Sequence, residues 1–174
     1  SMLLPVNKIQ RQLSTDEQIL EFFWGADSIY VISITDQNTN IFSIAKDLAA
    51  DSLFSSVYQF MNGTPSFEQD QIRNYSLWTN TLYKKFFDPF IRKKKVTIIP
   101  DGPLSLLSAE ALVVEHKPGK FSYNTLDYLI HHCEISYAYS SSILFRNDLK
   151  EVKKIDNVLA FSYSGGPGIP TLAN

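Results

Sequence analysis

One short segment limits the possible folds of this chain more than any other. Residues 96–99 (VTII) form a short apolar run, and Pro100, Asp101, Gly102 and Pro103 follow it without a spacer. A run of this kind is typical of a strand that helices cover on both faces of a sheet. The two prolines and the glycine stop such a strand abruptly. The segment therefore predicts an internal sheet strand that ends in a sharp corner.

The residues before this strand begin with a predicted helix and a hairpin. Ser14 and Glu17 have the spacing of a capping box, in which a hydroxyl and a carboxylate each satisfy a backbone donor at a helix start. With the apolar residues that follow, they predict a short helix that ends at Gly25. Residues 28–35 (SIYVISIT) and 41–44 (IFSI) flank a polar turn, which predicts a β-hairpin.

Two longer helices are predicted between the hairpin and the apolar strand. The first runs from Asp47 to a stop at Gly63, because apolar residues recur at helical spacing between them. The second is capped by Ser66 with Gln69 and ends at Pro89, which cannot continue a helix. The stripes expected to face the core are Ala50, Phe54, Val57 and Met61 in the first helix, and Ile72, Tyr75, Thr79, Leu82 and Phe86 in the second.

After the corner, short elements are predicted to return to the sheet. They are one helical turn over 108–112, a loop over 116–124, a strand over 130–139, a short helix that starts at Ser140, and a strand over 157–161. Strands interspersed with helices indicate the α/β class, with a mixed β-sheet flanked by helices. Residues 1–174 are expected to form a single domain, with helices and the hairpin over 14–91 and the first sheet strands and a Gly/Pro loop over 95–174.

Composition excludes some classes of partner. Sixteen basic and eighteen acidic side chains nearly cancel, so no strong field attracts a nucleic-acid backbone or an anionic membrane surface. The basic run over 92–95 is expected to be a solvated turn. No apolar stretch is long enough to span a bilayer. The single cysteine, Cys133, cannot form an internal disulfide, which favours a reducing, cytoplasmic location.

Residues 96–112 (VTIIPDGPLSLLSAEAL) resemble a known family. They are similar to the signature of CHAT domains, the caspase-like modules commonly found behind tetratricopeptide repeats. The order of later segments agrees, with EISYAYSSSIL at 134–144 and VLAFSYSGGPG at 158–168. The family usually carries Pro-Phe where this chain has Ser108 and Ala109, which weakens the match at that point. The resemblance implies the N-terminal part of a caspase-like fold.

The resemblance also implies a function. In CHAT domains, as in caspases and separases, a His and a Cys at the ends of two core strands form the catalytic dyad, and both come after the strand that matches residues 158–161. The chain is then the N-terminal segment of a cysteine peptidase that cleaves a partner protein, without a catalytic residue, metal or cofactor of its own and with tetratricopeptide-type repeats upstream. The implied rim of the substrate pocket is Asp101, Ser162, Tyr163, Ser164, Gly165 and Gly166.

Other interpretations stay open. From the residues alone, Asp101 is expected to bond the amides of its own turn, with a substrate contact as the alternative. The rival function is a non-catalytic CHAT-like scaffold or protein-interaction module.

A nucleotide site at the glycines after residue 161 is disfavoured, because no helix N-terminus is predicted to follow them. If residues 158–161 form an internal strand, its open edge predicts self-association, a swapped strand or coverage by the tail.

Three potentially reactive residues are adjacent in the sequence: His131, His132 and Cys133. This cluster could be interpreted as a catalytic dyad or a metal site. On the strand predicted over 130–139, only His131 and Cys133 share a face, and two ligands do not make a closed zinc site. His116 lies in a predicted loop and could come near, but nothing in the sequence requires it. The cluster is therefore expected to consist of packing or surface residues. Solvated positions are likewise expected for Asp148, Glu151 and Asp156.

Overall fold

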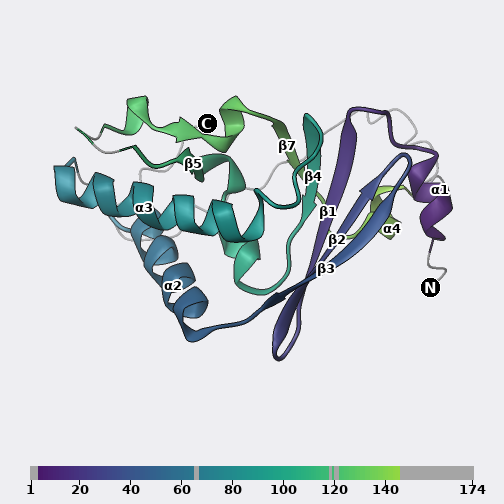
Figure 1. Ribbon diagram of the computed structural model, residues 1–174, viewed down its shortest axis with the longest axis horizontal. Helices are drawn as coiled ribbons and strands as arrows, with labels where there is room; N and C mark the ends of the chain where they lie inside the picture. Colours follow the sequence, from purple (N-terminus) through teal and green to yellow (C-terminus); the bar gives the residue numbers. More distant parts are fainter. Residues whose placement is uncertain (1–3, 65–66, 118, 120–121, 146–174) are drawn as a thin grey trace, which may run out of the picture.

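The computed structural model describes residues 4–64, 67–117, 119 and 122–145, and its centre is a five-stranded mixed sheet (Figure 1). The order across the sheet is β3-β2-β1-β4-β7. The strands are β1 (Glu17–Trp24), β2 (Ser28–Thr35), β3 (Thr39–Ala45), β4 (Lys95–Ile99) and β7 (Glu134–Tyr137). β2 is antiparallel to both β1 and β3, whereas β4 is parallel to β1 and to β7. The predicted α/β class with a mixed sheet flanked by helices is confirmed.

Helices lie on both faces of this sheet (Figure 1). α2 (Leu48–Asn62) and α3 (Gln69–Phe86) cover one face, and α1 (Val6–Gln10) and α4 (Ser141–Leu144) lie on the other. The connection from β4 to β7 consists of short pieces: η1 (Gly102–Leu106), η2 (Ala109–Ala111), β5 (Val113–Glu115), η3 (Tyr123–Thr125), β6 (Asp127–Tyr128) and η4 (Leu129–His131). No helix in the described ranges is long and apolar enough to cross a membrane.

Alternating side chains of the strands supply two cores. Leu20, Phe22 and Val31 point toward α2 and α3, where Phe54, Val57, Leu82 and Phe86 join them in one buried cluster. Ile19, Ile34 and Ile99 point the other way and pack with Ile9 of α1 and with Phe145. β1 is thus apolar on both faces because it lies inside the sheet.

Several predicted elements are confirmed. The hairpin is β2 with β3, and the apolar strand over 96–99 is β4. Asp47 caps α2, because its Oδ1 accepts a hydrogen bond from the Ala50 amide at 2.6 Å. The whole stripe predicted for the next helix is buried in α3: Ile72, Tyr75, Thr79, Leu82 and Phe86. The strand predicted over 157–161 lies outside the described residues.

The helix predicted between Ser14 and Gly25 is wrong, because β1 occupies this segment. Half of the capping box still forms: the Ser14 amide donates to Glu17 Oε2 at 2.8 Å, while the Ser14 hydroxyl bonds Asp16 instead. These contacts hold the turn that leads into β1. Pairing with β2 on one side and β4 on the other satisfies the backbone of the apolar residues, and this tertiary pairing overrides the local signal.

The strand predicted over 130–139 is also shorter than expected. β7 begins only at Glu134, since residues 129–131 form the 3-10 turn η4. The amides of His132 and Cys133 both bond to the carbonyl of Leu129, at 2.9 and 3.3 Å. The chain therefore coils before it joins the sheet, and Leu129 is buried in the main core as a result.

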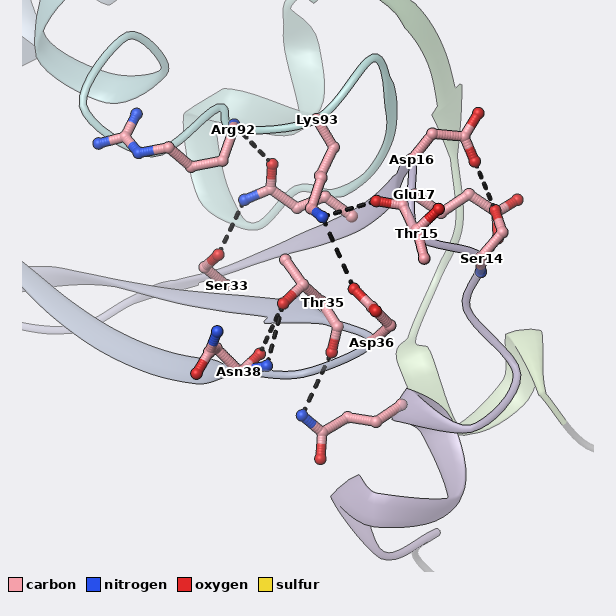
Figure 2. A network of polar contacts seen from close by, with 12 residues as sticks. Ser14, Thr15, Asp16, Glu17, Ser33, Thr35, Asp36, Asn38, Arg92 and Lys93 are labelled. Carbon is pink, nitrogen blue, oxygen red and sulfur yellow. Dashed lines mark hydrogen bonds and ion pairs between the residues drawn. The ribbon is translucent and has the colours of Figure 1, made fainter.

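A buried glutamine joins three separate parts of the fold at the start of β1. Gln18 Nε2 donates to Ser33 Oγ of β2 and to the Phe90 carbonyl, both at 2.8 Å. Its Oε1 accepts from the Arg92 amide at 2.8 Å. Figure 2 labels two of these partners, Ser33 and Arg92, and shows Lys93 reaching the Thr15 carbonyl nearby. The network aligns the α3–β4 turn with the sheet.

Replacing Gln18 should therefore destabilise the fold. Gln18→Leu keeps the bulk but leaves the Phe90 carbonyl and the Arg92 amide without this partner, so we expect the free energy of unfolding to fall by about 2–4 kcal/mol. Urea denaturation followed by circular dichroism measures this change. Gln12→Leu is the control, because the Gln12 amide bonds the Lys8 carbonyl on an exposed surface. Equal stability of the two variants would contradict the role assigned to Gln18.

Candidate functional site

The C-terminal ends of β1, β4 and β7 lie at one edge of the sheet, because these strands are parallel. Binding sites of open α/β sheets form preferentially at this kind of edge. The corner after β4 occupies its centre, with Pro100 leading out of the strand and η1 starting at Gly102. This edge is therefore the expected position of a functional site.

Asp101 holds the corner to the neighbouring strand. Its Oδ2 accepts a hydrogen bond from the amide of Trp24, at the end of β1, at 2.8 Å. Its Oδ1 accepts from the Gly102 amide at 2.9 Å. Both carboxylate oxygens are thus occupied by backbone donors, as expected for a residue that bonds its own turn. The contact with Trp24 adds a link between strands that the sequence did not predict.

Gly102 is required by geometry. Its φ of +58° lies in the left-handed region that favours glycine. A Cβ at this position would lie 2.7 Å from Cγ of Trp24. The Trp24 ring is held in turn by Phe54 of α2, at 5.3 Å between ring centroids, and by Lys46, whose Nζ lies 5.1 Å from the ring centroid. The corner, the end of β1 and α2 therefore form one packed unit.

Tyr137, at the end of β7, joins the same region from the other side. Its hydroxyl accepts from the Ala109 amide at 2.8 Å and donates to Glu110 Oε2 at 2.6 Å. Ser108 Oγ donates to the same carboxylate oxygen at 2.9 Å. Burial, together with the hydrogen bond to Glu110, raises the pKa of the Tyr137 phenol well above its usual range. Tyr137 is thus a protonated donor that positions η2.

A hollow of about 390 Å³ lies beside this group. It is lined by Pro100, Ser105, Tyr137, Ala138 and Tyr139, so uncharged residues from the corner after β4, from η1 and from the end of β7 form its walls. Tyr139 is 96% exposed. A hollow with these walls can accept an apolar or aromatic side chain of a partner, but its lining provides no nucleophile with an adjacent general base.

His131, His132 and Cys133 lie near the opposite edge, where β7 begins, and line a separate hollow of about 470 Å³. His132 Nε2 lies 2.7 Å from Asp127 Oδ1, and the His131 ring packs against Tyr128. The Cys133 thiol is buried and directed at the Leu129 carbonyl, 3.9 Å away. Burial, and to a smaller extent the charge of Glu110, raises the pKa of this thiol.

The cluster therefore lacks the features of a catalytic dyad. A reactive cysteine needs a lowered pKa and a histidine in contact with its sulfur. The third histidine, His116, is bonded through Nδ1 to Ser76 Oγ at 2.9 Å, on α3. Within the ranges that the structure describes, no group of three or more His, Cys, Asp or Glu side chains could hold a metal ion. The premise that the cluster sits on a strand was wrong, because η4 precedes β7.

Of the rim residues predicted from the resemblance, Asp101 alone falls in the described part of the chain. Ser162, Tyr163, Ser164, Gly165 and Gly166 lie outside it, as do Asp148, Glu151 and Asp156. Sequence reasoning missed Tyr137 and Glu110. The available signal was that side chains along a strand alternate between its two faces, which places Tyr137 on the same face as Ile135 at the end of the strand over 134–137.

Neither the family models nor the curated proteins that were compared with this chain match it.

Removing the Asp101 carboxylate should weaken the corner. Asp101→Ala leaves the partly buried Trp24 amide without its acceptor, so we expect a loss of about 1–3 kcal/mol in the free energy of unfolding. Asp101→Asn keeps the shape and one acceptor oxygen, and its loss should be smaller. Thermal and urea unfolding of the three proteins give the comparison. Unchanged stability in Asp101→Ala would show that the carboxylate does not hold the fold and would favour a substrate contact.

Cys133 should react slowly with alkylating agents. Its raised pKa keeps the thiolate scarce near neutral pH, and burial blocks access, so iodoacetamide should modify the folded protein at least about tenfold more slowly than the urea-unfolded protein. Mass spectrometry of samples quenched over time measures both rates. Rapid modification of the folded protein would overturn the assignment of Cys133 to the core.

Proposed function

We propose that this chain is the N-terminal part of a caspase-like CHAT peptidase that cleaves peptide bonds in a partner protein. The observation that supports this most is the setting of the segment resembling the CHAT signature. It enters the sheet as β4, between two parallel neighbours, and ends in a corner that Asp101 ties to β1. A rigid sheet edge of this kind can carry catalytic loops from further strands.

In this proposal the described residues supply the frame for the chemistry. Acyl transfer by a cysteine needs a histidine to take the thiol proton and amide donors for the developing oxyanion. Cys133 has a raised pKa and no histidine bonded to its sulfur. The reactive His and Cys are therefore assigned to sequence that follows residue 174, and the chain on its own is expected to be inert.

Substrate contacts are proposed at the same edge of the sheet. The hollow between Pro100 and Tyr137 is open beside the corner and has uncharged walls. The segment 162–166 borders the specificity pocket in this proposal, as the resemblance implies. Asp101 contributes by fixing the position of the corner, since its two oxygens are engaged by amides.

The second candidate is a non-catalytic interaction module. It is favoured by exposed apolar side chains on the sheet: Phe23 is 59% exposed, Tyr30 43% and Ile41 69%. Phe23 and Tyr30 contact each other, with ring centroids 6.3 Å apart. Such side chains on adjacent strands are suited to cover by another protein surface. A scaffold would use them without any downstream dyad.

Peptide cleavage separates the two candidates. A longer product of the same reading frame should hydrolyse peptides from a mixed library, whereas residues 1–174 should not, because the described cysteine has no histidine partner. Cys133→Ser in the longer product should leave the rate unchanged, since the Ser hydroxyl can still face the Leu129 carbonyl. An inactive longer product would favour the scaffold. Cleavage by residues 1–174 that stops when Cys133 is alkylated would overturn the proposal.

A further inference from the structure

β3 is the edge strand at the end of the sheet away from β7 (Figure 1), and it is exposed along almost its whole length. Among the described strands β2 is its one neighbour, so its other backbone edge is open in that part of the chain. Ile41 is 69% exposed and Phe42 is 38% exposed. β-branched and aromatic side chains stabilise a strand mainly by packing against neighbouring strands. The outer edge of β3 is therefore a surface suited to a further strand.

The hydrogen bonds between β2 and β3 determine which backbone groups of β3 point outward. The Thr35 amide bonds the Asn38 carbonyl, and the Lys46 amide bonds the Asp27 carbonyl. Hydrogen-bonded and non-hydrogen-bonded pairs alternate along an antiparallel ladder, so the even-numbered residues over 40–44 bond β2. The amides and carbonyls that point outward belong to the odd-numbered residues: Thr39, Ile41, Ser43 and Ala45.

The sequence of β3 lacks the features that usually prevent an edge strand from pairing with another chain. Such edges commonly carry a charged residue, a proline or a β-bulge. Residues 39–45 (TNIFSIA) contain no charged residue and no proline, and they pair with β2 in one continuous register. An uncharged strand can also lie beside an identical strand without repulsion between like charges. The edge is therefore compatible with a second copy of itself.

The charges at the two ends of β3 favour an antiparallel copy. Asp36 lies in the turn that precedes the strand, and Lys46 follows its last residue. The carboxylate of Asp36 is 3.6 Å from Lys93, whereas the neighbouring Asp47 is paired more closely with Lys85, at 2.6 Å. An antiparallel pair places the Asp36 end of one copy beside the Lys46 end of the other, and a parallel pair places like charges together. Complementary charges of this kind set the orientation of an interface.

We propose that β3 pairs with β3 of a second copy of this chain, antiparallel and around a two-fold axis, so that the two sheets continue into one. Pairing of the full strand, Thr39–Ala45, places the outward groups of Ile41 opposite those of Ser43 of the second copy. Phe42 then lies at the axis, opposite its own equivalent. Its ring packs on Phe90, at 5.0 Å between centroids, and gains a second aromatic neighbour in the dimer. The pairing does not depend on the proposed peptidase function.

Sedimentation equilibrium of residues 1–174 tests the association. A single pair of short strands makes a small interface, so we expect a dissociation constant of about 10–100 µM. I41K adds a charge to each edge, and S43P removes an outward amide while the bonds to β2 remain. Each variant should weaken association at least about tenfold. L77K is the matched control and should not, because Leu77 is a similarly exposed aliphatic residue on α3, at 46%.

Disulfide formation at the axis tests the register. F42C brings two thiols into a non-hydrogen-bonded pair with Cα atoms about 4.5 Å apart, which a disulfide can bridge. In N40C, the control, the two thiols lie about 14 Å apart along the strands, which is too far. The native Cys133 is buried and does not compete. In a glutathione buffer, F42C should form linked dimers at least about tenfold faster than N40C, as measured by non-reducing electrophoresis.

Three results would overturn the proposal. A protein that stays monomeric at concentrations about tenfold above the expected dissociation constant does not pair through β3. Amide hydrogen exchange of Ile41 and Ser43 in that monomer would then distinguish an open edge, if both exchange rapidly, from cover by the same chain, if both are protected. A dimer that survives both I41K and S43P has its interface elsewhere. Equal rates of cross-linking in F42C and N40C would exclude Phe42 from the axis.

Discussion

The parallel pairing of β4 with β1 and β7 is the constraint on which the rest of the structure depends. β4 contributes Val96 and Ile98 to one core and Ile99 to the other, so each layer of helices packs against it. Its two ends are fixed by polar groups. Gln18 holds the turn that leads into it, and Asp101 holds the corner that leads out of it. Because both residues bond backbone groups, the position of β4 is set by hydrogen bonds as well as by apolar contacts.

The same arrangement separates the contact between Tyr137 and Glu110 from the histidine–cysteine cluster at residues 131–133. Tyr137 and Glu110 lie with the corner at the C-terminal edge, and their hydrogen bonds connect η2 to the end of β7. Cys133 lies before β7 and turns its thiol into the core. A buried thiol with a raised pKa stabilises packing but is a poor nucleophile. In the described residues Cys133 is therefore a packing residue, and the contact between Tyr137 and Glu110 is structural.

Secondary-structure elements could be predicted from the sequence where the local residue pattern and the tertiary environment favour the same structure. The hairpin could be predicted because two β-branched runs flank a polar turn, and β4 because an apolar run stops at Pro100. β1 was mistaken for a helix because Ser14 and Glu17 have the spacing of a helix start, and the pairing that decides its state comes from residues distant in sequence. Alternation could place Tyr137 at a strand end, but its hydrogen-bond partners could not be recognised, since the residues of η2 become its neighbours only in the fold.

The order in which these strands appear along the chain matters for how the protein is made. The hairpin of β2 and β3 with β1 is local and emerges from the ribosome early, yet the backbone edge of β1 that pairs with β4 stays open until Lys95–Ile99 have been synthesised. Pairings between distant segments form slowly, because a long loop must close first. During that interval the nascent sheet exposes an unpaired apolar strand, which is the kind of surface that chaperones retain.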